Sequence, residues 1–222
     1  MRRKLPRFLF IAAALALTVA APAQSMRVKD LAAGKLLVAP RKSPDPSFAR
    51  TVILLVQKDG DGALGLMLNR RTKVSISEAL QDVKAAKQNS DPIYMGGPVE
   101  LNGVLALFRS QAKPDDTRHV IADIFWASAR EPLEKALAAG TGPAEFRIYL
   151  GYCGWGAGQL EREVELGGWF IFNADPALVF DTDPGSLWSR LIARTEERIA
   201  LAGGKACITL ARTKPPGFTV LR

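Results

Sequence analysis

Short apolar runs separated by turn residues predict most of the strands of this chain. Residues 51–56 are apolar on both faces, as in a central buried strand, and residues 36–39 form a shorter run of the same kind. A turn at residues 59–62 connects 51–56 to the run at 63–68, which predicts a β-hairpin. Further strands are expected at 93–95, 104–108, 120–122, 146–150 and 169–172.

Helical periodicity and capping residues predict the helices. Ser75 begins a Ser-x-x-Glu capping box, followed by apolar residues at helical spacing, which predicts a helix over 75–88. The same spacing at Ser128 predicts a helix capped by that residue and ending at Gly140. Other helices are expected to begin near Gln159, Pro176 and Pro184. This mixture of strands and helices, without a repeat or a long linker, predicts one α+β domain over residues 24–222.

Residues 1–23 have the organisation of a secretory signal peptide. A basic start precedes an apolar run from Phe8 to Ala21, and small residues lead to a predicted cleavage site after Ala23. The apolar run spans about 14 residues, whereas a membrane-spanning helix needs roughly 20. We therefore expect a periplasmic or secreted bacterial protein with no membrane span after cleavage. An uncleaved anchor, or a cytoplasmic protein whose translation starts at Met26, remains the alternative.

Composition and charge exclude several kinds of function. The chain of 222 residues has one His and two Cys, too few for Cys/His zinc sites or iron–sulfur clusters, so no metal or cofactor is expected. The predicted leader contains four basic residues and no acidic one, so its removal lowers the net charge from +8 to +4. Without a helix–turn–helix pattern or a clustered basic face, no sequence-specific nucleic-acid binding is expected of an exported chain.

Five motifs in a fixed order carry a family resemblance. They are residues 34–40, 45–48, 62–70, 96–99 and 150–161. On these motifs the chain resembles the uncharacterised YqgE/AlgH family, also called UPF0301, from about residue 34 to residue 195. The resemblance implies an α+β fold whose mixed, bifurcated sheet is partly closed as a small barrel and surrounded by helices. Family members carry a transcriptional-regulator label, through an association with alginate control, but no established reaction or ligand. The tail from about residue 203 diverges from the family pattern.

Candidate ligand- or partner-binding residues lie in three segments. They are Asn69 and Arg70; Gly96 and Gly97; and Gly151, Gly154, Trp155, Gly156, Gln159 and Glu161. Arg70 has the bidentate geometry that suits an anionic group, or it ties a loop to a carboxylate elsewhere in the fold. The glycine-rich segment 151–158 joins a predicted strand to a predicted helix, where amide N–H groups can hold a phosphate or carboxylate. The alternative is that its glycines allow tight packing around Tyr152 and Trp155, and that Gly96 and Gly97 form a turn.

No catalytic residue is identified, because the chain has no G-x-S-x-G motif and its single His lies near no recognisable nucleophile motif. In an oxidising compartment Cys153 and Cys207 are expected to pair, whereas in the cytosol both thiols would stay reduced. Our first interpretation is an exported, non-enzymatic binding or regulatory module whose partner is an unknown protein or a small anionic ligand. The alternatives are a cytosolic transcriptional regulator starting at Met26, and a hydrolase or transferase that uses carboxylates such as Asp175 and Glu161.

Overall fold

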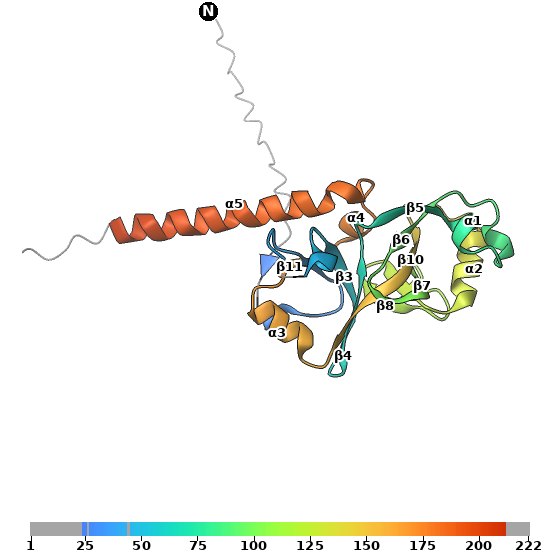
Figure 1. Cartoon of the computed structure of the whole chain (residues 1–222), viewed down its shortest axis with the longest axis horizontal. Coiled ribbons are helices and arrows are strands. Elements are labelled where there is room, and N and C mark those ends of the chain that lie inside the picture. The colour runs from blue at the N-terminus through green and yellow to red at the C-terminus, as the bar shows by residue number, and fades with distance from the viewer. Residues whose placement is uncertain (1–23, 26, 44, 212–222) are drawn as a thin grey trace, which may run out of the picture.

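The computed structural model describes residues 24–25, 27–43 and 45–211, with side chains for residues 27–43 and 45–197 (Figure 1). The strands are β1 (Gln24–Ser25), β2 (Lys35–Val38), β3 (Val52–Lys58), β4 (Gly62–Met67), β5 (Arg71–Ser75), β6 (Pro92–Met95), β7 (Val99–Arg109), β8 (Arg118–Ile121), β9 (Ile124–Ala127), β10 (Phe146–Gly156) and β11 (Phe170–Asn173). The α-helices are α1 (Ile76–Ala79), α2 (Arg130–Ala138), α3 (Gln159–Glu165), α4 (Pro176–Val179) and α5 (Pro184–Ala211). Three short 3₁₀ helices are η1 (Val28–Asp30), η2 (Pro46–Phe48) and η3 (Lys84–Ala86).

Strand β10 joins the two halves of the sheet. Its N-terminal half lies between β7, which is antiparallel to it, and β6, which is parallel. Its C-terminal half pairs antiparallel with β4, from which the sheet continues through β3, β2 and β11 to β1. On the other side, β7 leads through β9 to β8, and β5 pairs with β6. The sheet is strongly curled into a half-barrel with helices around it, which confirms the predicted α+β class (Figure 1).

The β3–β4 hairpin forms as the apolar pattern predicts. Residues Val52 to Val56 of β3 are all buried, because the strand lies in the middle of its half of the sheet. The turn is held by Asp59, whose Oδ1 accepts hydrogen bonds from the amides of Asp61 (3.0 Å) and Gly62 (3.2 Å). Such local bonding by an Asp side chain favours a turn over a continued strand.

The helix predicted over residues 75–88 is wrong in length. Ser75 does form the capping box, but α1 ends at Ala79. The chain then continues in tighter turns, with the amide of Val83 bonded to the carbonyl of Leu80 (3.0 Å) and the amide of Ala86 bonded to that of Val83 (3.0 Å). The apolar side chains that a helix would have buried are still buried in these turns, because a three-residue spacing fits successive 3₁₀ turns as well as an α-helix.

Helix α2 begins two residues after the predicted cap. Ala129, not Ser128, is its N-cap, and no side chain caps it. Pro132 explains the shift. If Ser128 were the N-cap, residue 132 would have to donate the first i→i−4 hydrogen bond, and proline has no N–H group to donate. The predicted end is confirmed, since Gly140 has φ +68° just after the last turn.

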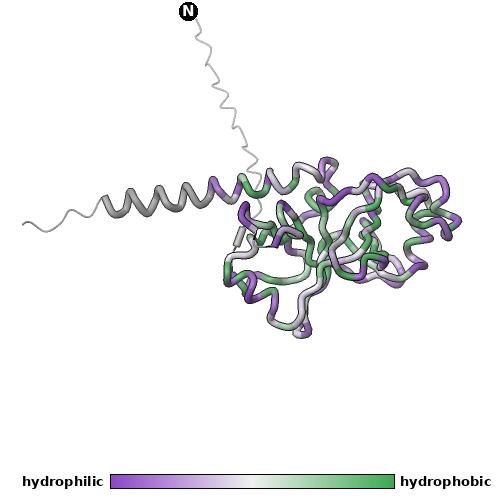
Figure 2. Tube along the Cα trace, viewed as in Figure 1, coloured by the Kyte–Doolittle hydropathy of each residue, from purple (hydrophilic) through white to green (hydrophobic). Residues whose placement is uncertain are grey.

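Three apolar clusters fill the space between the sheet and its helices. In Figure 2, hydrophobic stretches of the trace gather in the body of the molecule, and hydrophilic stretches lie mostly at its outer turns. The largest cluster lies under α4 and α5, the second lies under α1 and α2, and the third lies under α3. Helix α5 begins at Pro184 as predicted and buries Leu187, Trp188, Leu191 and Ile192, while its later turns extend past the sheet (Figure 1). None of the described helices combines the length and hydropathy that a membrane-spanning helix needs.

Arg147 is a buried cation inside the otherwise apolar start of β10. Its guanidinium donates to the carbonyl oxygens of Pro143 (3.0 Å), Val179 (3.2 Å) and Asp181 (2.7 Å). It also lies 5.2 Å from the ring centroids of Tyr94 and Phe180. Arg147 therefore ties the centre of the sheet to the segment that connects α4 with α5.

Candidate functional site

The side chains of Asn69 and Arg70 form hydrogen bonds with the loop that precedes β3. The Asn69 side chain accepts a hydrogen bond from the amide of Val52 (2.9 Å) and donates one to the carbonyl of Arg50 (2.9 Å). Arg70 donates to the carbonyl of Ala49 (2.9 Å). Arg50 has φ +57°, an unfavourable value for a residue with a side chain, so these bonds hold a strained loop in place. Arg70 thus ties down a loop, although through a backbone carbonyl and not through the carboxylate considered above.

Gly96 and Gly97 lie directly against β10. A Cβ atom on Gly96 would come within 2.1 Å of the carbonyl oxygen of Gly151, and one on Gly97 within 2.1 Å of the carbonyl carbon of Tyr152. Gly151 itself has φ +67°, at the register shift where β10 passes from one half of the sheet to the other. The structure therefore brings these three glycines together where two backbones cross at close range.

The glycine-rich segment belongs to strand β10 as far as Gly156, whereas the sequence predicted a strand that ends at residue 150. Gly154, Trp155 and Gly156 continue β10 and pair with residues 62–64 of β4. The amide of Gly156 donates to the side chain of Gln159 (3.2 Å), the first residue of α3. Pairing with β4 was not visible in the sequence, because it depends on a strand about 90 residues earlier in the chain.

Glu161 lies beside the end of β3. Its carboxylate forms an ion pair with Lys58 at 2.9 Å. The hydrogen bond from Lys58 holds the pKa of Glu161 below its ordinary value. The Glu161 carboxylate is thus used in an ion pair within the protein, whereas Glu165 on the same helix is exposed.

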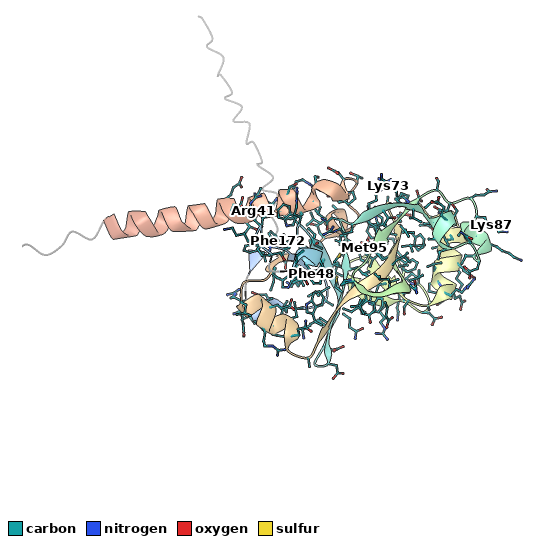
Figure 3. The ribbon with its side chains drawn as sticks, viewed as in Figure 1. Arg41, Phe48, Lys73, Lys87, Met95 and Phe172 are labelled. Atoms are coloured by element: carbon teal, nitrogen blue, oxygen red, sulfur yellow. The ribbon has the colours of Figure 1, made fainter. Side chains whose placement is uncertain are left out.

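A pocket walled by apolar and aromatic side chains lies next to α3. Its volume is about 450 Å³. The residues that line it are Pro40, Lys42, Ser43, Asp45, Phe48, Glu163, Leu166, Gly167, Gly168 and Trp169. We call it the Glu163 pocket. Phe48, labelled in Figure 3, packs its ring edge-on against Trp169, with 5.5 Å between ring centroids. Leu166, at the rim, is 87% exposed, which is unusual for a leucine in a folded domain.

Glu163 is the best-bonded acidic side chain of this pocket. Its Oε2 accepts hydrogen bonds from the indole nitrogens of Trp155 (3.0 Å) and Trp169 (2.8 Å). Its Oε1 accepts a third from Gln159 (3.0 Å). All three donors are neutral, and no ion pair to Glu163 is found within the described part of the chain. A half-buried carboxylate therefore lines the pocket without an ion pair to any described cation.

Sequence analysis missed the Glu163 pocket. The i, i+2, i+4 spacing of Glu161, Glu163 and Glu165 places only Glu161 and Glu165 on a common helix face, and it assigns no role to Glu163. Trp155 lies on β10 and Trp169 lies just before β11, and only the fold turns both indole N–H groups toward one carboxylate. The one signal in the sequence was the presence of two tryptophans close to α3 on either side, which indicates aromatic packing but not its polar partner.

Another cavity, of about 540 Å³, lies between the segment from Lys113 to Arg118 and the segment from Trp126 to Ala129. Arg118 lies 5.5 Å from the Trp126 ring centroid and also donates to Gln57 (2.9 Å). Arg118 is thus already engaged within the fold, and the other charged residues that line this cavity are Lys113 and Asp116. Within the described residues, no three His, Cys, Asp or Glu side chains are grouped as a metal ion would require.

The side chain of Cys153 is fully buried, and no described side chain forms a disulfide bond with it. Its Sγ lies 3.4 Å from the carbonyl oxygen of Gly96, and burial raises its pKa far above the ordinary value. The side chain of Cys207 lies outside the described residues, so the pairing of the two cysteines stays a prediction.

Taken together, the fold and the pocket define a class: a small α+β half-barrel with a single strand common to both halves of its sheet and an aromatic-walled pocket beside α3. The chain belongs to the AlgH-like family, whose model (DUF179) matches residues 36–200. This confirms the family resemblance read from the five motifs.

Relatives of known sequence and structure agree with this assignment. The chain is 38% identical over 165 residues to a UPF0301 protein of Chlorobium luteolum, covering 74% of this chain and 86% of the relative. It is 36% identical over 176 residues to a UPF0301 protein of Pseudomonas aeruginosa, covering 77% and 92%. The solution structure of AlgH from P. aeruginosa matches with a TM-score of 0.57 and 31% identity, covering 83% of this chain and 95% of that one. A crystal structure from Corynebacterium diphtheriae, at 24% identity, has the same fold, with a TM-score of 0.62 and coverage of 74% and 87%.

Proposed function

We propose that this protein is an exported, non-enzymatic binding module whose ligand or partner occupies the Glu163 pocket. The observation that carries the proposal is the pocket itself, in which a half-buried carboxylate sits between aromatic and apolar walls. Ligand sites in proteins have this character, being mostly apolar cavities with a few placed polar groups. Export is supported by the signal-peptide organisation of residues 1–23.

A binding role, and not catalysis, is supported by the state of the reactive side chains. The single His of the chain, His119, bonds through its ring to the carbonyl oxygen of Ala122 (2.9 Å). The Cys153 thiol is buried, and burial raises its pKa, which disfavours the nucleophilic thiolate. Neither side chain lines the Glu163 pocket.

Two measurements test the proposal. Intact-mass analysis of protein from a periplasmic extract should give a chain that begins at Gln24. Only cytoplasmic protein beginning at Met1 or Met26 would contradict export and would favour the regulator alternative.

Binding is tested by following indole N–H signals in NMR spectra of the isolated protein. The chain has four tryptophans. A ligand in the pocket should shift the signal of Trp169, which lines it, and that of Trp155, whose indole bonds Glu163, while those of Trp126 and Trp188 stay in place. Trp→Phe variants assign the signals. A chemically diverse fragment set that never moves the two pocket signals would contradict a binding role for this pocket.

A further inference from the structure

We infer that the Glu163 pocket selects a small organic cation, an alkylammonium or quaternary ammonium group on an apolar body. This inference rests on the proposed binding function and adds the chemical class of its ligand. It differs from the small anion that the sequence suggested, because the anion-binding candidates are used inside the fold and do not line this pocket.

The charges around the pocket favour a cation. Asp45 and Glu163 contribute two carboxylates and Lys42 contributes one ammonium group, so the lining carries an excess of one negative charge. Glu163 is fixed by three neutral donors, which orient its carboxylate without neutralising it. Lys42 and Asp45 are both exposed, so solvent screens their opposite charges more strongly than the charge of the half-buried Glu163.

The walls favour an organic cation over a metal ion. Phe48 and Trp169 present aromatic carbon, and Pro40 and Leu166 present aliphatic carbon, which binds methyl and methylene groups by the hydrophobic effect. Aromatic rings also attract cations through their quadrupole. A metal ion would require several oxygen or nitrogen ligands at short range, and the pocket has two separate carboxylates, one already bonded to two indoles.

Two ligands of the same shape test whether charge contributes to binding. One is choline, which carries a trimethylammonium group, and the other is its uncharged carbon isostere, 3,3-dimethylbutan-1-ol. Both are titrated to about 50 mM, a range that captures the weak affinities expected of very small ligands. Choline should shift the indole N–H signals of Trp155 and Trp169 and bind at least about tenfold more tightly than the isostere. Equal affinities for the two compounds would overturn the inference.

Two substitutions test which residues select the charge. Glu163→Gln keeps an oxygen to accept the indole bonds but removes the charge, and it should weaken choline binding about tenfold. Glu165→Gln is the matched control, because Glu165 is exposed on the same helix and should leave binding unchanged. Lys42→Ala should strengthen choline binding by about twofold or more, since it removes the opposing charge of the rim. Weaker choline binding by Lys42→Ala would contradict a cation site even if the Glu163 variant failed to fold.

The two proposals fail in different ways. If choline leaves the pocket signals unchanged while a neutral or anionic fragment shifts them, the cation inference is wrong and the binding function stands. If neither choline nor any fragment shifts them, the proposed function is wrong as well.

Discussion

Arg147 should be among the most stabilising polar side chains of this protein. The substitution Arg147→Met removes the donor from the three carbonyl oxygens that the arginine bonds, while it keeps an apolar side chain of similar length. Hydrogen bonds from a charged donor contribute about 1.5–3 kcal/mol each. The two ring contacts add about 1 kcal/mol. Removing a buried charge recovers several kcal/mol of desolvation cost, which leaves a net loss of about 3 kcal/mol.

The assay is urea unfolding followed by tryptophan fluorescence, with Arg194→Met as the control. Arg194 is exposed, so its substitution should change the free energy of unfolding by less than about 0.5 kcal/mol. Arg147→Lys keeps the charge but cannot reach three separated carbonyls, and it should lose about 2 kcal/mol. If Arg147→Met were as stable as Arg194→Met, the carbonyl contacts would not stabilise the junction of β10 with the α4–α5 segment.

Three further predictions concern the close packing and the charges described above. Gly97→Ala should lose about 3 kcal/mol or more in urea unfolding, because its Cβ would overlap backbone atoms, whereas Gly142→Ala, which meets nothing within 4 Å, should be tolerated. Thiol titration of unfolded, unreduced periplasmic protein should find no free thiol if Cys153 and Cys207 pair, and two free thiols would exclude the bond. The pKa of Glu161 is lower in the folded protein than its ordinary value of 4.5. The Glu161 carboxylate therefore stabilises the fold fully at pH values above 4.5, and this contribution is lost as the pH falls through the folded-state pKa. The stability difference between wild type and Glu161→Gln, measured by urea unfolding at a series of pH values, should therefore shrink on acidification below about pH 4.5, and a difference independent of pH would contradict the ion pair.

Local signals in the sequence predicted local structure well. The β3–β4 hairpin, the capping box at Ser75 and the helix start at Pro184 each depend on residues close together in the chain, and all three are confirmed. The helix over 75–88 was too long because apolar spacing alone does not distinguish α-helical from 3₁₀ turns. The strand at 146–150 was too short because glycines argue against a strand when its distant partner is unknown.

The candidate site could be predicted only in part, because the partners of its side chains are also distant in sequence. Asn69, Arg70 and Gln159 are polar residues beside predicted element ends, where ligands often bind, and each uses its side chain within the fold instead. No pattern in the sequence around Glu163 indicates that its carboxylate is half-buried. Whether such a carboxylate meets water or two indoles depends on tertiary packing, which periodicity does not encode.

The place of β10 in the chain bears on how the protein is made. Both halves of the sheet need this strand, yet residues 146–156 are synthesised after β4, β6 and β7, their future partners. Until residue 156 has emerged from the ribosome, those earlier strands have open edges that can pair with other chains. Folding must therefore wait for most of the polypeptide and then close the sheet through contacts distant in sequence, which is slow. A chain that ended before residue 146 would lack the partner that β4, β6 and β7 share, so each of those strands would keep an open edge.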